Sequence, residues 1–496
     1  MVIKDDDGRN REVPQGPWQE RVRYAEQWRG PFAYRPEDVL VYGGRGQEAA
    51  SIAWEMWPGD ADRIRLAPER IGPPGDGMAV AERLEGVPDP LRLIDDLRLR
   101  GFGAQPNHVL FVHCNCCGPH PAFGGCGGIN PAGINPAGIN PAGINPAGIN
   151  PAGINPAGIN PAGINPAGIN PAGINPAGIN PAGINPAGIN PDDPFRLTGL
   201  RRSSARPAAP SAKTATAMSA KIVTKPRKFA PRVFVLDTGL ASTFGAPVLA
   251  NAFAAQSIDQ NASAVVDVAD ADDNKFVDPA AGHGTFIAGV INQVAPGCTV
   301  SVGQVASMYG DTDEFLAARM VEDLLPQVDD RSILSLSFGG YALDDAAAAL
   351  GWAIAEFQAR GGVVVASAGN DSTCRPAFPA ALRDVVSVGA IGPSGPALFT
   401  NYGAWVRACA PGVDILSMFF TGFVGQGQPG PDGVDPDNFS GWARWSGTSF
   451  SAPVVVGALA RMMMWSGCNA KDAVKRVVDT PGLMRIPGLG TVVNVI

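Results

Sequence analysis

Long apolar runs, a dominant positive charge and an N-terminal signal stretch are all missing from this sequence of 496 residues. The longest apolar run, residues 452–467, is too short to span a membrane and contains Arg461, so it predicts a buried helix of a globular core. The net charge of −8 favours neither nucleic acid nor a membrane as a partner. Residues 1–18 contain no apolar signal stretch, so the expected location is cytoplasmic, although an unconventional export route would leave no such mark.

Cysteine and histidine are also scarce, and they are unevenly placed. Eight cysteines in so long a chain do not make a disulfide framework. Four of them and three of the four histidines fall within residues 107–126, where thiolates and imidazoles suit zinc but the C-x-C-C spacing strains a tetrahedral site. Metal binding, thiol regulation and no special role therefore stay open for this cluster. Its side chains are Cys114, Cys116, Cys117, Cys126, His108, His113 and His120.

A pentapeptide repeat divides the chain. The unit GINPA runs from Gly128 to Pro191 in twelve full copies and one truncated copy. Its regular prolines and glycines exclude a continuous helix or a central strand, so an extended or mobile spacer is predicted, with a small pentapeptide-repeat β-solenoid as the alternative. The segments are a tail at 1–37, a small α+β domain at 38–113, a Cys/His-rich segment at 114–127, the repeat at 128–191, an Ala/Ser/Pro-rich linker at 192–227 and an α/β domain at 228–496.

Residues 228–496 alternate apolar strands with helices. Runs such as VFVLD and VVVAS predict buried strands, and residues 312–325 and 345–361 predict helices between them. This alternation implies a parallel sheet with helices on both faces. In such a sheet, functional side chains gather where strands end and helices begin.

Several polar side chains stand at such positions. Asp237 ends the strand VFVLD, His283 lies between two glycines at a helix start, and Ser449 starts an apolar helix. His283 is the last histidine of the chain, so an imidazole base in this domain must be His283. A serine that attacks a carbonyl needs a histidine to take its proton and a carboxylate to orient that histidine. Asn370, just beyond a buried strand, offers an N–H to the developing oxyanion, with the backbone N–H of Ser449 as second donor.

The motifs VFVLDTG, GHGTFIAGVI, SLSFGG, VVVASAGN and WSGTSFSAP, in this order, make residues 228–496 resemble the subtilisin-like serine peptidases (subtilases). The resemblance implies a parallel-sheet subtilisin-like fold and hydrolysis of internal peptide bonds through an acyl-enzyme, with no cofactor required for catalysis. It assigns Ser449 as the nucleophile and Ser446 and Ser451 as structural residues that bond local backbone. Small residues around the specificity pocket suggest room for a large apolar side chain. The implied substrate-binding residues are Ser337, Phe338, Gly339, Gly340, Ser367, Ala368 and Gly369.

Calcium is a frequent structural ion in that family, and the acidic stretch at residues 270–278 is a candidate site. The stretch lacks the central glycine of an EF-hand loop and has Ala281 at the twelfth position in place of glutamate. A solvated acidic loop is therefore favoured over a bound ion.

Residues 38–113 predict the order strand, helix, strand, helix, strand, which is compatible with a small ferredoxin-like domain. Subtilases often carry such a domain as an inhibitory propeptide, and AQPNHVLFV resembles its C-terminal tail. The resemblance implies that the chain's own N-terminal domain blocks the substrate groove, although the repeat replaces the usual short junction. Protein or peptide substrates are the other expected partners. The alternative function is an interaction scaffold, whose repeat and Cys/His-rich segment bind a partner while the peptidase domain stays latent.

Overall fold

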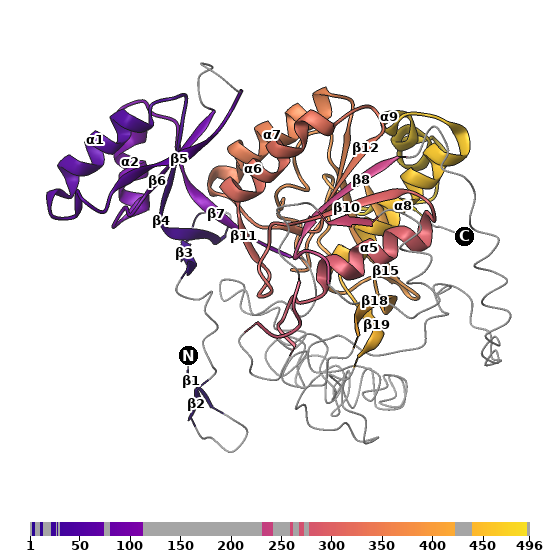
Figure 1. Ribbon diagram of the computed structural model, residues 1–496. Coiled ribbons are helices and arrows are strands. Elements are labelled where there is room, and N and C mark those ends of the chain that lie inside the picture. Colours follow the sequence, from indigo (N-terminus) through magenta and orange to yellow (C-terminus); the bar gives the residue numbers. More distant parts are fainter. Residues whose placement is uncertain are drawn as a thin grey trace. The chain divides into compact units, whose positions relative to one another are not determined.

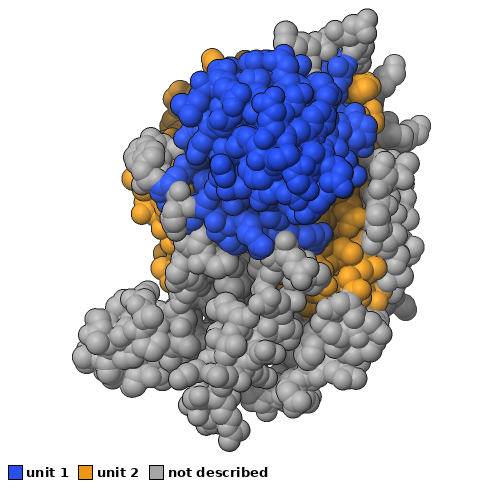
Figure 2. Space-filling view, turned by 90° about the vertical axis from the view of Figure 1, so that its left-hand side faces the viewer, with its two compact units in different colours: residues 1–110, 311–319, 341–353 blue, residues 111–310, 320–340, 354–496 orange. Residues whose placement is uncertain are grey.

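The computed structural model describes residues 2–4, 10–12, 21–25, 27, 30–73, 80–112, 231–241, 258–260, 267–271, 277–421 and 439–493. The predicted Cys/His-rich segment, repeat and linker lie outside these residues. Two compact units divide the chain, as Figure 2 shows. Unit 1 comprises residues 1–110, 311–319 and 341–353, and unit 2 comprises residues 111–310, 320–340 and 354–496.

Unit 1 contains a β-α-β-β-α-β body with an antiparallel sheet in the order β7-β4-β6-β5. Strand β11 lies beside β7, and β3 pairs with β4. Helix α2 begins at Pro90 after Asp89, whose side chain accepts a hydrogen bond from the N–H of Arg92, a combination typical of helix starts. The bounds are β1 Val2–Lys4, β2 Asn10–Glu12, β3 Arg23–Ala25, β4 Phe32–Tyr42, α1 Gly46–Met56, η2 Pro58–Asp60, β5 Arg65–Ile71, β6 Ala81–Glu85, α2 Pro90–Leu99, β7 Ala104–Val112 and β11 Asp311–Asp313.

Strand β6 is absent from the sequence prediction, which has five elements between residues 38 and 113. Only Ala81 and Leu84 of this strand are buried, so its sequence AERLE shows no alternation of apolar and polar residues. The strand instead joins the sheet by pairing with β4 and β5. The buried core of this body comprises Val39, Val41, Ala49, Ala50, Ala53, Ile64, Leu84, Val87, Leu93, Ile94, Leu97, Phe102 and Ala104.

Unit 2 is built on a large sheet in the order β20-β21-β17-β15-β14-β12-β8-β10-β9. The strands from β21 to β9 run parallel, while β20 and β16 are antiparallel additions. Every residue of β12 and β14 is buried, as expected for the inner strands of a parallel sheet. The bounds are β8 Arg232–Asp237, β9 Ile258–Gln260, β10 Thr299–Gln304, β12 Ser332–Leu336, β14 Val363–Ser367, β15 Val386–Gly392, β16 Gly395–Pro396, β17 Ala408–Pro411, β20 Arg485–Ile486 and β21 Gly490–Val492.

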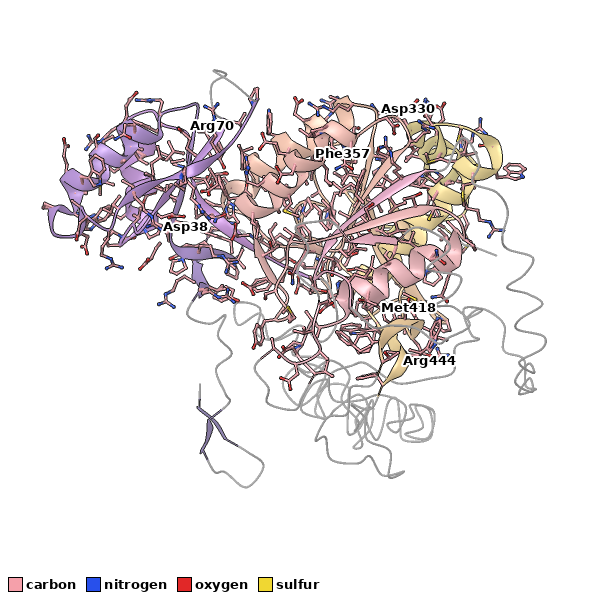
Figure 3. All side chains as sticks on the ribbon, in the orientation of Figure 1. Asp38, Arg70, Asp330, Phe357, Met418 and Arg444 are labelled. Carbon is pink, nitrogen blue, oxygen red and sulfur yellow. The ribbon has the colours of Figure 1, made fainter. Side chains whose placement is uncertain are left out.

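Helices α5 and α8 pack against each other and against this sheet, as can be followed in Figure 1. In the part of α7 that belongs to unit 2, the ring of Phe357 (labelled in Figure 3) is perpendicular to that of Phe234 on β8, with 6.4 Å between the centroids. Strands β18 and β19 form an antiparallel hairpin that packs on α5. The bounds are α5 His283–Val294, α6 Glu314–Leu324, η6 Leu325–Gln327, β13 Phe338–Gly339, η7 Leu343–Asp345, α7 Ala348–Ala359, β18 Ile415–Thr421, β19 Ser440–Trp445, α8 Thr448–Ser466, α9 Ala470–Val474 and η8 Lys475–Asp479.

Two sequence predictions need refinement here. The apolar run 452–467 lies in α8 up to Ser466 and is buried through its first half, as predicted, whereas Trp465 near its end is 79% exposed. The run SILSLSFGG at residues 332–340 also predicts a single buried strand, but the structure has two, because β12 and β13 are separated at Ser337. Among the described residues, no helix combines the length and the apolar character that crossing a membrane requires.

Candidate active site

Asp237 lies at the carboxyl end of β8, an inner strand of the parallel sheet. Strand β8 pairs with β10 on one side and with β12 on the other. The backbone carbonyl of Asp237 accepts hydrogen bonds from the N–H groups of Val305 and Ala306, at 2.7 and 3.0 Å. Asp237 is fully buried. In α/β folds this edge of a sheet is where ligand sites form.

The imidazole of His283 lies against this carboxylate. Its Nδ1 is 2.7 Å from Asp237 Oδ1, and the N–H of Thr238 donates to the same oxygen at 2.8 Å. Because a carboxylate oxygen accepts hydrogen bonds, Nδ1 carries the proton, and Nε2 of the neutral ring is the basic nitrogen. His283 is thereby oriented to act as a base through Nε2.

Glycines flank His283 because larger residues would not fit. Gly282 has a φ of +79°, and a Cβ added there would lie 2.2 Å from the ring of Phe419. A Cβ added to Gly284 would lie 2.3 Å from the carbonyl oxygen of Gly239. Gly284 therefore lets the start of α5 approach the chain at the end of β8, and Gly282 leaves room for Phe419 of β18.

The substitution Gly284→Ala is expected to lower the free energy of unfolding by about 2–3 kcal/mol, because the new Cβ meets a backbone atom that cannot turn aside. Thermal unfolding measured by circular dichroism tests this. Gly59→Ala is the matched control, since an added Cβ there has no atom within 4 Å. Equal melting temperatures for the two variants would contradict the packing argument.

Aromatic rings surround the imidazole. The ring of Trp445 is perpendicular to it at 5.5 Å between centroids, and the ring of Phe450 lies at 5.3 Å. His283 is fully buried, and its Nε2 has no hydrogen-bond partner among the described residues. An unpaired basic nitrogen in these surroundings is placed to take a proton from a neighbouring hydroxyl.

Ser449 is the second residue of α8, directly before Phe450. Since α5 and α8 pack together and the Phe450 ring lies against the imidazole, the helix start that carries Ser449 lies next to His283. The Ser449 hydroxyl donates to the carbonyl of Ser337 at 2.9 Å, and the Ser337 hydroxyl donates to the carbonyl of Ser449 at 3.0 Å. These two bonds fix the start of α8 to the end of β12.

Asn370 is anchored to the same helix start. Its Oδ1 accepts hydrogen bonds from the backbone N–H and the hydroxyl of Thr448, at 3.0 and 2.8 Å. Because the oxygen is engaged, Nδ2 is the end of the amide that can donate to a ligand. The N–H of Ser449 lies in the first turn of α8, where amides have no acceptor within the helix. The four predicted catalytic residues thus gather around the starts of α5 and α8.

The two neighbouring serines differ from the prediction that they bond local backbone. The Ser446 hydroxyl accepts from the N–H of Asp414, 32 residues away. The Ser451 hydroxyl is buried and has no hydrogen-bond partner among the described residues. It lies so close to Gly412 that an added Cβ there would approach it to 2.0 Å. The predicted local bonds are therefore wrong for both serines.

The strand predicted to bind substrate is already paired in the structure. Phe338 in β13 pairs with Val112, at the end of β7, in antiparallel register. The adjacent pair joins Gly339 to Phe111. All four residues belong to unit 2, and the N–H of Val112 also donates to the carbonyl of Gly310 at 2.9 Å. The end of β7 therefore occupies backbone positions at which an extended peptide could pair.

The pairing partner changes after β13. Gly340, also predicted to bind substrate, exchanges both of its backbone hydrogen bonds with Phe378, at 2.9 and 2.8 Å. A peptide could use the backbone of Gly340 only by breaking this pair. The predicted substrate strand is therefore divided, with Phe338 and Gly339 facing β7 and Gly340 facing an internal loop.

The second predicted pocket wall is largely part of the core. Ser367 is fully buried at the end of β14. The methyl group of Ala368 packs in an apolar cluster, and its carbonyl accepts from Asn401 Nδ2 at 2.9 Å. The N–H of Gly369 donates to the hydroxyl of Thr448 at 3.1 Å. Through this last hydrogen bond, residues 367–369 at the end of β14 are held to the start of α8.

Two residues beside the site, Asp267 and Trp445, are not among the predicted ones. Asp267 stands in VVDVADADDN, where several aspartates look alike in the sequence. Trp445 opens the motif WSGTSFSAP, and a large ring before a run of small residues is a signal that could have indicated it. Trp445 lies at the end of β19, far from His283 in the sequence, so the contact between the two rings depends on the fold.

No group of three or more His, Cys, Asp or Glu side chains is placed to hold a metal ion within the part of the chain that the structure describes. The Cys/His-rich segment and residues 272–276 of the acidic stretch lie outside that part. Zinc in the former therefore stays one of three open alternatives, and the expectation of a solvated loop rather than calcium at 270–278 stays untested. The described ends of the acidic stretch meet, since the N–H of Ala271 donates to Asp278 Oδ2 at 2.7 Å.

The sequence profile of the Subtilase family matches residues 230–477, half of the chain. The thermophilic serine proteinase of Bacillus sp. (strain AK1) is 35% identical over 136 residues, which are 27% of this chain and 28% of that protein. Subtilisin-like protease 2 of Pseudogymnoascus destructans is 29% identical over 209 residues, which are 41% of this chain and 47% of that protein. This chain thus spans less than half the length of either relative.

A solved structure shares the fold. Fervidolysin from Fervidobacterium pennivorans, described as a keratinolytic enzyme related to subtilisin, superposes with a TM-score of 0.51 at 17% identity. The superposition covers 93% of this chain and 60% of fervidolysin. At this identity the likeness concerns the fold alone.

Proposed function

The chain belongs to the subtilase family of serine peptidases, and we propose that it is an endopeptidase that hydrolyses protein or peptide substrates through an acyl-enzyme on Ser449. The observation that carries the proposal is the buried Asp237–His283 pair, with Nδ1 and Oδ1 2.7 Å apart, beside the helix start that holds Ser449. A serine triad is recognised by such geometry and roles. Catalysis in this scheme requires no cofactor.

The first step is attack by the Ser449 oxygen on a peptide carbonyl. His283 Nε2 takes the hydroxyl proton as the bond forms, and Asp237 stabilises the resulting imidazolium through Nδ1–H. The Ser449 hydroxyl donates to Ser337 in the structure, so it exchanges this acceptor for Nε2 in the reactive arrangement. His283 then gives the proton to the leaving amine, and water releases the acyl group by the reverse roles.

The tetrahedral intermediate carries a negative oxygen that needs donors. Asn370 Nδ2 and the backbone N–H of Ser449 are the two donors that we assign to it. The Thr448 bonds to Asn370 Oδ1 support this role, because they fix the amide before substrate arrives. Loss of one such donor typically lowers kcat about 10²–10³-fold.

The chain's own β7 is proposed to keep the peptidase latent. Phe111 and Val112 pair with β13 in the manner of an extended peptide. Because β7 runs antiparallel to β13, its direction leads from Gly339 toward Ser337, which holds the Ser449 hydroxyl. The strand therefore approaches the nucleophile as the residues before a scissile bond would.

An ion cluster inside unit 1 supports this latency. The guanidinium of Arg35, on β4, donates to Asp311 Oδ2 at 2.9 Å and to Asp313 Oδ2 at 3.1 Å. The side chains of Arg35 and Asp311 are 15% and 2% exposed, so little water screens this pair. The β-α-β-β-α-β body is thereby bound to the inserted segment 311–319.

A buried histidine binds the same body to both inserted segments. His108 Nδ1, on β7, is 2.5 Å from Glu314 Oε2, and its Nε2 accepts the N–H of Leu343 at 2.9 Å. The other oxygen of Glu314 accepts the N–H of Ala349 at 2.8 Å. Leaving one partner of such a buried hydrogen bond without its donor or acceptor typically costs about 1–3 kcal/mol, which fits a durable association.

Self-processing is the test of activity and latency together. The intact mass of the purified full-length protein is compared with that of Ser449→Ala. We expect the wild type to be cut shortly after Val112, because β7 ends there, paired with Phe338 next to Ser337. The variant is expected to stay whole. Cleavage of both proteins at the same bond would assign the cut to another protease.

A wild type that stays whole would exclude self-processing and leave the N-terminal domain as a tethered regulator. Residues 228–496 assayed alone on casein then decide whether the site is active. The repeat and the Cys/His-rich segment, on which a scaffold function would depend, lie outside the described residues and add no support to that alternative.

A further inference from the structure

A second buried carboxylate lies beside the Asp237–His283 pair. Asp267 is 2% exposed and belongs to a short described stretch, 267–271. Its Oδ2 accepts two hydrogen bonds, from the hydroxyl of Thr238 at 2.8 Å and from the N–H of Gly282 at 2.9 Å. Its Oδ1 is buried without a hydrogen-bond partner among the described residues. Burying a carboxylate is costly, so a position this close to the site calls for a reason.

The two donors are the chain neighbours of the reacting pair. Thr238 follows Asp237, and Gly282 precedes His283. The Thr238 hydroxyl also accepts the N–H of Gly284 at 3.0 Å. The backbone N–H of Gly282, before His283, therefore donates directly to Asp267. The N–H of Gly284, after His283, donates to Thr238, which in turn donates to Asp267.

This link matters because Asp237 and His283 lie on different elements. They are 46 residues apart, one at the end of β8 and the other at the start of α5. A single oxygen of Asp267 joins the strand end to the helix start. Asp267 itself is held to the strand end, since it forms a parallel bridge with Ala241 and its N–H donates to the carbonyl of Leu240 at 3.3 Å.

We infer that Asp267 is a positioning residue, which sets the distance between Asp237 and His283 by holding Thr238 and Gly282 on its Oδ2. The inference rests on the proposed function, because it concerns the same reaction. Asp267 touches neither the imidazole nor Ser449 in the described hydrogen bonds, so it acts through the backbone around the histidine.

The groups around Asp267 favour a role as a hydrogen-bond acceptor over a role as a negative charge. Burial raises the pKa of Asp267 well above its usual range, and the charges of Asp237 and Asp278 raise it further. A neutral carboxylic acid with its proton on Oδ1 still accepts both hydrogen bonds at Oδ2. Asparagine at this position offers the same acceptor without a charge and is therefore the conservative replacement.

The test compares four variants of the full-length protein: Asp267→Ala, Asp267→Asn, Thr238→Val and Thr238→Ser. The probe is succinyl-Ala-Ala-Pro-Phe-p-nitroanilide, chosen for the large apolar side chain before its scissile bond. Active sites are counted with a fluorophosphonate, and melting temperatures are recorded. We expect Asp267→Ala to lower kcat 10- to 100-fold with KM within about twofold, because small displacements of reacting groups cost that much.

Rescue separates positioning from a general loss of structure. Asp267→Asn and Thr238→Ser keep the acceptor and the hydroxyl, so each is expected to retain kcat within about threefold. Thr238→Val should lower kcat at least as much as Asp267→Ala, because it removes the bond to Asp267 and also the bond from Gly284. The double variant should lose less than the sum of the two losses, since both single variants remove the bond between Thr238 and Asp267. A kcat of Asp267→Ala within threefold of wild type, or a fully additive double variant, would overturn the inference.

The outcome also distinguishes this inference from the proposed function. If the folded wild type does not hydrolyse the probe and residues 228–496 alone do not hydrolyse it either, the proposed function fails and the variants are uninformative about chemistry. Activity of residues 228–496 alone would instead assign the silence of the full-length protein to the proposed latency, and the variants are then compared in that shorter chain. If the wild type is active, Ser449→Ala is inactive and Asp267→Ala is unchanged, the inference alone is wrong. Should Asp267→Ala fail to fold, Thr238→Val against Thr238→Ser decides the question.

Discussion

Ser449→Ala is expected to lower kcat on the order of 10⁴-fold or more against the peptide anilide, with KM little changed. The substitution removes the atom that forms the acyl-enzyme, while Asn370 and the Ser449 N–H still bind the carbonyl oxygen, so a residual rate above that of water remains. The measurement is steady-state hydrolysis by the full-length protein after its active sites have been counted with a fluorophosphonate. The variant should also fail to react with that probe.

Ser446→Ala and Ser451→Ala are the matched controls, because all three hydroxyls fall within six residues of one motif. Ser446 bonds the distant N–H of Asp414, and the Ser451 hydroxyl is buried without a described partner. Removing an unpaired buried hydroxyl is nearly neutral, so Ser451→Ala should keep kcat within about threefold. If either control lost as much kcat as Ser449→Ala, the loss would reflect a folding role of the motif and would not identify Ser449 as the nucleophile.

Asp237→Asn is expected to lower kcat about 10⁴-fold with little change in stability. The amide keeps the shape of the carboxylate, but it can donate a hydrogen bond to Nδ1 of His283. The imidazole proton then moves to Nε2, the nitrogen that must accept from Ser449. The measurement is kcat/KM for the same anilide at neutral pH, alongside a melting curve.

Asp278→Asn is a suitable control, since Asp278 is another buried aspartate of unit 2 whose Oδ2 bonds the N–H of Ala271 and not a histidine. It should keep kcat within about tenfold. If Asp237→Asn retained more than a tenth of the wild-type kcat, His283 would not depend on Asp237 for its orientation, and the proposed mechanism would have to be replaced.

The sequence predicts those strands, helices and close contacts that depend on residues near one another along the chain. The runs VFVL and VVVA, each followed by one polar residue, are apolar because both faces of β8 and β14 are covered, and they predict buried strands directly. Helix α8 follows in the same way from a long run without a charge before Arg461. Glycines around His283 mark a close approach, and the structure shows which atoms they avoid.

Features that depend on remote contacts are the ones that the sequence does not disclose. Strand β6 has two buried residues and is stabilised by pairing with its neighbours, so its own pattern is weak. Asp267 resembles the aspartates beside it, and only its bonds to Thr238 and Gly282 set it apart. The break between β12 and β13 likewise reflects a change of partner, from the parallel sheet to β7.

The pairing of β7 with β13 constrains how this protein can change over generations. A substitution at Phe338 or Gly339 that admits a new substrate alters the backbone against which Phe111 and Val112 lie. Under the proposed latency, a lineage that gains a new cleavage preference must alter residues 111–112 in step to keep β7 paired with β13. Directed evolution for altered specificity should accordingly recover paired substitutions at these two places, which is a practical reason to diversify them together in one library.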